Sequence, residues 1–232
     1  MGAWRASLLI MSVILCGTTS AQSISVVDDD QRTVTLSGPA QRIISLAPHV
    51  TEQLFAIGAG EKIVGAVDYS DYPEAAKAIP RVGGYSRLDL ERILALKPDL
   101  IVGSSSGNNT QQLERLETMG LTVYRSEPSR LEDIASGMEK LGQLTATQEQ
   151  ASQQAVAFRR RVEDLRASTK GKATHTLFYQ IWNRPLMTVN GEALINEVLT
   201  LCGGRNIFAD LPMLNPKVST EAVFVADPEV IS

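Results

Sequence analysis

The chain has 232 residues and a formal net charge of −4 at pH 7, and 44% of its residues are hydrophobic and 21% charged. These values are ordinary for a soluble globular protein, and acidic and basic residues are interspersed along the sequence. Because a basic face is missing, the composition argues against a protein that binds nucleic acid or an anionic membrane surface.

The N-terminal segment has the pattern of a secretory signal peptide. Its only charge is Arg5, the apolar run Leu8–Cys16 is too short to cross a bilayer, and Thr19–Ala21 supplies small residues before a cleavage site. We therefore expect residues 1–21 to be removed during export and the mature chain to lack a membrane-spanning segment. Lipid attachment at Cys16 is an alternative, although the preceding leucine is larger than such a signal normally carries.

The segment 22–145 is predicted to form an α/β lobe. Short apolar strands alternate with helices, a pattern typical of a parallel sheet that is covered on both faces. The predicted elements, in chain order, are a hairpin over 22–36, a strand over 42–46, a helix over 52–57 capped by Thr51, a strand over 62–67, a helical turn over 75–79, a strand over 100–103, a helix over 110–119, a strand over 121–124 and a helix over 131–144. In such folds ligands bind at the loops that follow the carboxyl ends of the strands.

Residues 146–169 are predicted to form one long helix that connects this lobe to a second one. Apolar residues recur at helical spacing from Ala151 to Leu165, and most other positions are polar. We interpret the arginine run 159–161 as a solvated helix face rather than a site for an anionic partner, because acidic residues follow it closely.

The α/β pattern resumes over 170–232, which we predict to be the second lobe. A strand is expected over 175–181, a loop over 182–185 and a helix over 193–201.

A pattern of fourteen residues occurs twice and relates the two lobes. Its copies are Leu88–Ile101 (LDLERILALKPDLI) and Val218–Ile231 (VSTEAVFVADPEVI). In each copy a polar capping residue stands two positions before a glutamate, and a helical run, a proline and the start of a strand follow. The capping residues and glutamates are Asp89 with Glu91 and Ser219 with Glu221. The repeat predicts two similar lobes with one glutamate at the equivalent place on each.

The second copy of the repeat stops at the opening of its strand, at Ser232. In the first copy a long stretch of chain follows this point, so we expect the sequence to lack C-terminal elements of the second lobe.

Outside the leader the chain has a single cysteine, Cys202. In an exported protein such a cysteine is either a buried thiol or half of a disulfide with a partner outside the given sequence.

Several signatures of catalysis are missing. His49 and His175 lack metal-ligand spacing, and the sequence has no glycine-rich phosphate loop and no Gly-x-Ser-x-Gly nucleophile turn. The run 104–107 (SSSG) is interpreted as only a polar loop. We therefore expect a binding protein and not an enzyme, with a secreted α/β enzyme and an interaction domain as the other open classes.

Aromatic residues follow predicted strands in both halves of the chain. Tyr69 and Tyr72 lie after the strand 62–67, Tyr85 precedes the first repeat, and Trp182 follows a strand of the second lobe. Aromatic side chains in a cleft between two lobes supply broad contact for a large planar ligand.

Export, two α/β lobes, one connecting helix and the repeated glutamate resemble the class III periplasmic solute-binding proteins, which serve ATP-driven importers of cobalamin, haem and iron siderophores. The most specific segments are 69–73 (YSDYP), 90–99 (LERILALKPD) and 202–208 (CGGRNIF). They are most similar to the cobalamin-binding members. The resemblance implies two Rossmann-like lobes joined by one long helix, with the second lobe incomplete.

The resemblance also implies a site and a ligand, cobalamin or another tetrapyrrole. The expected ligand-binding residues are Pro48, His49, Tyr69, Tyr85 and Trp182. At the place of Tyr85 the family carries a tryptophan. The protein is expected to act as a periplasmic monomer without a further cofactor.

Two glutamates and one cysteine receive further roles from the resemblance. Glu91 and Glu221 are expected to dock on arginines of the two subunits of an ABC transporter permease. Cys202 matches a cysteine that is disulfide-bonded in the family, and its partner is expected beyond the chain end.

Haem- or siderophore-binding members of the same class are the alternative. The haem-binding members carry an iron-ligating tyrosine one position earlier, at the place of Gly84, whereas this chain has Tyr85. A shift of one residue along the chain points the tyrosine side chain in a different direction, so the sequence favours cobalamin over haem as the ligand. Ligation of iron by Tyr85 and His49 is the arrangement that haem would need.

Overall fold

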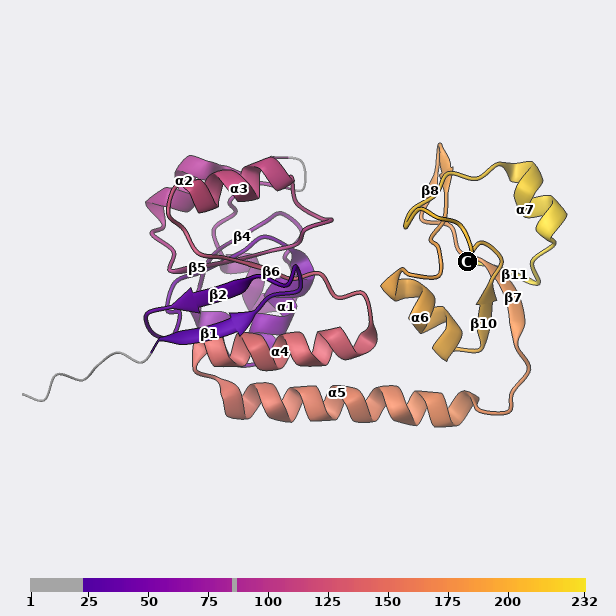
Figure 1. Ribbon diagram of the computed structural model, residues 1–232, viewed down its shortest axis with the longest axis horizontal. Helices are drawn as coiled ribbons and strands as arrows, with labels where there is room; N and C mark the ends of the chain where they lie inside the picture. The colour runs from indigo at the N-terminus through magenta and orange to yellow at the C-terminus, as the bar shows by residue number, and fades with distance from the viewer. Residues whose placement is uncertain (1–22, 85–86) are drawn as a thin grey trace, which may run out of the picture.

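The computed structural model describes residues 23–84 and 87–232, which form two α/β lobes joined by a long helix (Figure 1). The predicted α/β class is therefore confirmed. The predicted signal peptide and Tyr85 lie outside the described residues. Among the described helices, none combines the length and apolarity needed to cross a membrane.

The first lobe is built on a parallel four-stranded sheet of order β4-β3-β5-β6. Its strands are β3 (Ile43–Ser45), β4 (Ile63–Ala66), β5 (Leu100–Gly103) and β6 (Val123–Arg125). The two central strands, β3 and β5, are buried at every position, as parallel strands covered on both faces require. The strand predicted over 121–124 begins two residues later, at Val123.

Helices and a hairpin cover the two faces of this sheet (Figure 1). The elements are β1 (Ile24–Val27), β2 (Thr33–Leu36), α1 (Pro48–Ala56), α2 (Leu90–Ala95), α3 (Thr110–Thr118), α4 (Leu131–Thr145) and the 3₁₀ turns η1 (Gly60–Lys62) and η2 (Glu74–Ala78). Consecutive strand residues point to opposite faces, so Ile43 packs with α1 and α4 whereas Ile44 packs with α2 and α3.

Helix α1 starts earlier than predicted. It begins at Pro48, because proline at the first helical position has a suitable φ and needs no hydrogen-bond acceptor for its nitrogen. Thr51 is therefore not the cap: it lies inside the helix, fully buried, and its hydroxyl forms a 2.8 Å hydrogen bond with the Ser45 hydroxyl. This bond ties α1 to the end of β3.

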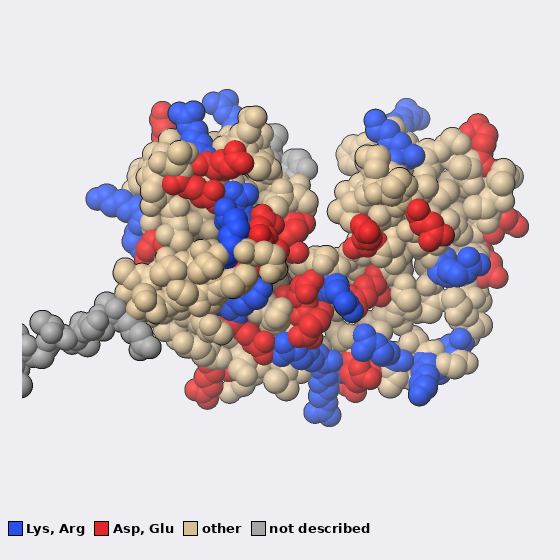
Figure 2. All heavy atoms as spheres, in the orientation of Figure 1, with Lys and Arg blue, Asp and Glu red and all other residues tan. Residues whose placement is uncertain are grey.

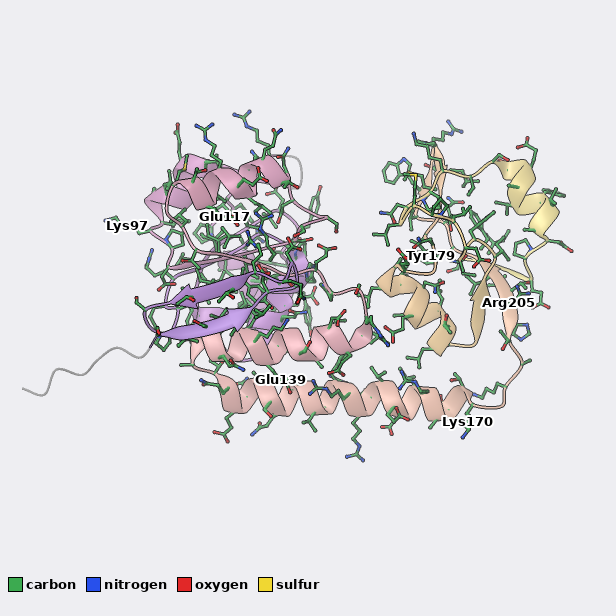
Figure 3. All side chains as sticks on the ribbon, viewed as in Figure 1. Lys97, Glu117, Glu139, Lys170, Tyr179 and Arg205 are labelled. Carbon is green, nitrogen blue, oxygen red and sulfur yellow. The ribbon has the colours of Figure 1, made fainter. Side chains whose placement is uncertain are left out.

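A cluster of charged residues joins the first hairpin to β6. Asp28 is fully buried and accepts hydrogen bonds from the backbone N–H groups of Arg32 (2.8 Å) and Arg125 (3.3 Å). Glu117 of α3, labelled in Figure 3, pairs with both guanidinium groups, at 2.8 Å to Arg32 and 2.9 Å to Arg125. Burial by itself raises the pKa of Glu117, but the two arginines outweigh it and the net pKa is lowered.

The connecting helix α5 (Gln148–Thr169) packs along α4 and then leads into the second lobe (Figure 1). Ala151 and Ala155 are fully buried in this contact. Arg159 binds two carboxylates of α4, Glu132 at 2.6 Å and Glu139 at 2.7 Å. The arginine run thus contributes one residue to helix packing, rather than only a solvated face.

The second lobe is built on a parallel sheet of order β10-β7-β11. Its elements are β7 (His175–Phe178), β8 (Trp182–Asn183), β9 (Leu186–Met187), α6 (Leu194–Leu201), β10 (Gly204–Asn206), α7 (Thr220–Ala226) and β11 (Val230–Ile231). Two predictions were wrong here: the strand ends at Phe178 instead of residue 181, and the segment 182–185 is not a simple loop. The antiparallel pairing of β8 with β9 makes a short hairpin of it.

Both copies of the repeat adopt the predicted helix-to-strand structure. The Asp89 carboxylate accepts from the Arg92 backbone N–H at 3.0 Å, and the Ser219 hydroxyl accepts from the Ala222 N–H at 3.1 Å. Each side chain thus caps its helix, α2 or α7. In Figure 1 these two helices lie on the same side of the molecule, opposite α5.

Candidate functional site

A cavity of 560 Å³ lies at the carboxyl edge of the first-lobe sheet. Parallel strands end at one edge, so the segments that follow β3, β4, β5 and β6 meet there. These segments supply Ala47–His49, Val67–Tyr69, Ser104–Asn108 and Glu127–Pro128 to the site, and Leu194 of α6 reaches it from the second lobe. Figure 2 shows that the space between the lobes is open in this view, with acidic side chains on both sides.

Tyr69 lines this cavity, as predicted, and 83% of its surface is exposed. Its backbone has a φ of +65°, in the left-handed region that costs a residue other than glycine about 1–2 kcal/mol. Neighbouring hydrogen bonds fix this conformation: the Asp68 N–H donates to Gly83 O at 2.9 Å, and the Arg81 guanidinium donates to Ser70 O at 3.0 Å. These bonds fix the backbone from which the exposed tyrosine side chain projects at the cavity wall.

Pro48 and His49 also line the cavity, because α1 starts at its floor. Desolvation by the surrounding walls lowers the pKa of His49, and the carboxylates of Glu127 and Glu52 oppose this effect only in part. The residue as a whole is exposed, so the desolvation is partial, and the lowered pKa favours the uncharged imidazole at neutral pH.

The loop after β5 is polar, as predicted from the sequence, and it also forms a wall of the cavity. The Glu127 carboxylate holds this loop by accepting hydrogen bonds from the Ser104 hydroxyl (2.9 Å), the Ser106 backbone N–H (2.9 Å) and the Ser106 hydroxyl (2.5 Å). The Asn108 amide donates to Leu46 O at 2.8 Å and fixes the loop against β3. Sequence reasoning missed these residues, although their place after predicted strands was a usable signal.

Gln53 is a further lining residue that the sequence did not single out. It is 8% exposed, and its side-chain oxygen has no hydrogen-bond partner among the described residues. A buried oxygen of this kind is a candidate acceptor for a ligand N–H group.

The remaining predicted ligand residues are not gathered at the cavity. Trp182 is 60% exposed on β8, where its Nε1–H donates to Arg184 O at 3.0 Å, and it is not among the residues that line the cavity. Its hairpin does lie on the side of the second lobe that faces the first lobe (Figure 1). Tyr179, labelled in Figure 3, follows β7 at the corresponding edge of the second-lobe sheet. Tyr85 lies outside the described residues.

The two repeat glutamates are exposed in the first turns of their helices. Hydrogen bonding to its own backbone and to Ser219 lowers the pKa of Glu221. Neither Glu91 nor Glu221 forms an ion pair with another described residue. Both carboxylates are free to meet a cationic partner.

The described residues contain no group of three histidine, cysteine or acidic side chains placed to hold a metal ion. Cys202 is exposed with a free thiol, and within the described part of the chain it has no disulfide partner.

Comparison with known proteins relates the chain to periplasmic binding proteins. The model of the periplasmic binding protein family matches residues 43–232. The vitamin B12-binding protein of Vibrio campbellii is 42% identical over 195 residues, which cover 84% of this chain and 71% of that protein. The vitamin B12-binding protein of Yersinia pestis is 43% identical over 192 residues, which cover 83% of this chain and 69% of the relative.

Solved structures show the same similarity. The crystal structure of the periplasmic vitamin B12 binding protein of Vibrio cholerae matches with a TM-score of 0.78 and 42% identity, over 83% of this chain and 76% of the other. A periplasmic heme binding protein from Pseudomonas aeruginosa matches with a TM-score of 0.73 and 28% identity, over 83% of this chain and 71% of that one.

Proposed function

The chain belongs to the periplasmic binding protein family, and on this basis we propose that it captures cobalamin or a related corrinoid between its lobes and delivers it to an ABC-type import permease. The observation that carries the proposal is the 560 Å³ cavity at the carboxyl edge of the first-lobe sheet, lined by Tyr69 and open toward the second lobe. Its action is binding and release, without a chemical step.

The residue at position 84 favours a corrinoid over haem as the ligand. At the position where haem-binding members carry a ligating tyrosine, this chain has Gly84, and a Cβ atom there would lie 2.7 Å from Asp68 Oδ2. A side chain at that position would displace the Asp68 carboxylate. Haem remains the second candidate because the heme binding protein of Pseudomonas aeruginosa shares the fold at 28% identity.

Delivery is proposed to depend on Glu91 and Glu221. Their helices lie on one side of the molecule, one on each lobe, and both carboxylates are exposed (Figure 1). An interface in which each carboxylate meets an arginine of a different permease subunit would fix the orientation of both lobes.

The family relationship implies a periplasmic location. We propose that residues 1–21 direct export and are removed. We further propose that residues 22–145 and 170–232 act as two lobes that move as units about the helix 146–169, and that a single copy of the chain binds one ligand.

The test is titration of the purified mature protein with cyanocobalamin and with haemin. Binding is followed by the fluorescence of Trp182 and by the visible absorption of the ligand. Saturable quenching by cyanocobalamin, with no shift of the haemin Soret band, is the expected result. Saturable haemin binding without a response to cyanocobalamin would overturn the assignment.

A further inference from the structure

The residues that line the cavity carry charge of one sign. Asp68 and Glu127 both contribute carboxylates, and the described lining residues include no lysine or arginine. His49 is the one described lining residue that can become cationic near neutral pH, and its pKa is lowered from the ordinary histidine value, mainly by desolvation. Among charged side chains of the described lining, a ligand therefore meets two carboxylates and no lysine or arginine.

Two cations of the first lobe are already paired with other acids. Lys140 binds Asp29 at 3.0 Å, and Arg125 binds Glu117 at 2.9 Å. Within the described part of the chain, neither Asp68 nor Glu127 forms an ion pair. The negative charge at the cavity wall is thus left without a direct counter-ion.

The same wall offers acceptors for hydrogen bonds. The Asp68 residue is exposed, and its carboxylate receives no hydrogen bond from a described residue. The side-chain oxygen of Gln53 is buried and unpartnered among the described residues. Amide N–H groups of a ligand satisfy such acceptors, and hydrogen bonds to a carboxylate are strong. A carboxylate on the ligand offers no donor and is repelled.

We propose that Asp68 and Glu127 select for tetrapyrroles whose peripheral groups are uncharged amides and against those whose peripheral groups are carboxylates. This inference rests on the proposed function, because it concerns the ligand of the same cavity. It assigns to two residues the discrimination between an amide-bearing corrinoid and the dipropionate haem.

The test uses ligands that differ at one group. Mild acid hydrolysis converts single peripheral propionamides of cyanocobalamin to propionates and yields separable monocarboxylic acids. We expect the unsubstituted protein to bind at least one of these acids about tenfold or more weakly than cyanocobalamin, because like charges at close range cost more than about 1.4 kcal/mol. In the double variant Asp68→Asn with Glu127→Gln, the difference should shrink to about threefold or less.

The substitutions Asp68→Asn and Glu127→Gln remove charge and keep the size and shape of each side chain. A glutamine at position 127 keeps an oxygen that can accept from Ser104 and Ser106, so the loop after β5 should stay in place. Glu61→Gln is the matched control, because it removes one charge from an exposed residue that does not line the cavity. This control should leave the tenfold difference intact, and thermal unfolding should show that all variants fold.

Equal binding of cyanocobalamin and all of its monocarboxylic acids would contradict the selectivity, as would a difference that persists in the double variant. Absence of cyanocobalamin binding would instead contradict the proposed function. In that case the role of the two carboxylates is tested with haemin, which the double variant should bind more tightly than the unsubstituted protein does. Equal or weaker binding of haemin by the double variant would contradict that role.

Discussion

The side chain of Glu197, in α6 of the second lobe, accepts a 2.6 Å hydrogen bond from the backbone N–H of Leu131, the first residue of α4 in the first lobe. The first backbone N–H groups of a helix have no partner within the helix, and a carboxylate placed there also interacts favourably with the helix dipole. This single contact therefore joins the two lobes at a point distant in sequence from the connecting helix.

Replacement of Glu197 by alanine should loosen this junction. We expect the free energy of unfolding to fall by about 1 kcal/mol and the Leu131 amide to exchange its hydrogen faster. Chemical denaturation and hydrogen exchange measure both effects. Glu192→Ala is the control, since this exposed residue lies near α6 and its carboxylate forms no hydrogen bond with a described residue. Unchanged exchange at Leu131 in the Glu197 variant would contradict the contact.

The double variant Glu91→Ala with Glu221→Ala should abolish ligand uptake and leave ligand affinity unchanged. Truncating one partner of an interfacial charge pair costs about 2–5 kcal/mol, and two pairs would be lost here. Uptake of labelled cyanocobalamin by cells or proteoliposomes, together with equilibrium binding, measures the two properties. Glu149→Ala with Asp164→Ala removes two exposed charges from α5, on the opposite side, and should transport normally. Normal uptake by the first variant would refute docking through these residues.

His49 should make the stability of the fold depend on pH. Because desolvation lowers its pKa in the folded state, the unfolded chain binds the proton more readily. His49 therefore makes its full contribution to the free energy of unfolding above a pH of about 6.5, the pKa of histidine in the unfolded chain. This contribution is lost as the pH falls toward the lowered pKa of His49 in the folded protein. Denaturation at pH 7.5 and 5.5 should show a smaller loss of stability in His49→Gln than in the unsubstituted protein. An equal loss of stability in the variant and the unsubstituted protein would show that other titratable groups govern stability between pH 7.5 and 5.5.

Arg125→Ala should be among the more damaging single changes in the first lobe. Arg125 is 4% exposed, and its removal leaves Glu117 with Arg32 as its one remaining cation in the described structure. Breaking a fully buried pair by removal of one partner costs about 3–5 kcal/mol. Because the Glu117 side chain is 29% exposed and keeps Arg32, we expect a loss near or below the lower end of this range. Urea denaturation measures the loss, and Arg166→Ala, at an exposed pair on α5, should cost less than about 1 kcal/mol. A loss of similar size in both variants would argue against the importance of the cluster.

Features fixed by local interactions could be predicted from the sequence. Asp89 and Ser219 each accept a hydrogen bond from the backbone N–H three residues later and so cap their own helices. The local sequence of the repeat is therefore enough to predict its helix in both lobes. Thr51 shows where this reasoning failed. A threonine before a helical run is a good capping candidate, but here its hydroxyl bonds to Ser45 across the fold, and Pro48 starts the helix instead.

The composition of the site depended on contacts between distant segments. Glu127 and Ser104 are 23 positions apart, and only the pairing of β5 with β6 brings them to one wall. The position of each residue after a predicted strand is a local signal, but it does not show that the two residues meet. Tyr69 was singled out because several aromatic residues from both halves of the chain lie next to predicted strands or the repeat, and because the segment 69–73 resembles the family.

The cavity is walled mainly by loops that leave the sheet at four separate strands, with Gln53, Ile134 and Leu194 added from helices. Most residues of the two hydrophobic cores do not line it. Insertions or substitutions in one loop therefore need not disturb strand register or either core. Exchange of these loops between relatives is a practical route to binding proteins with new ligands, because recognition can change while the scaffold and the surface that carries Glu91 and Glu221 stay the same.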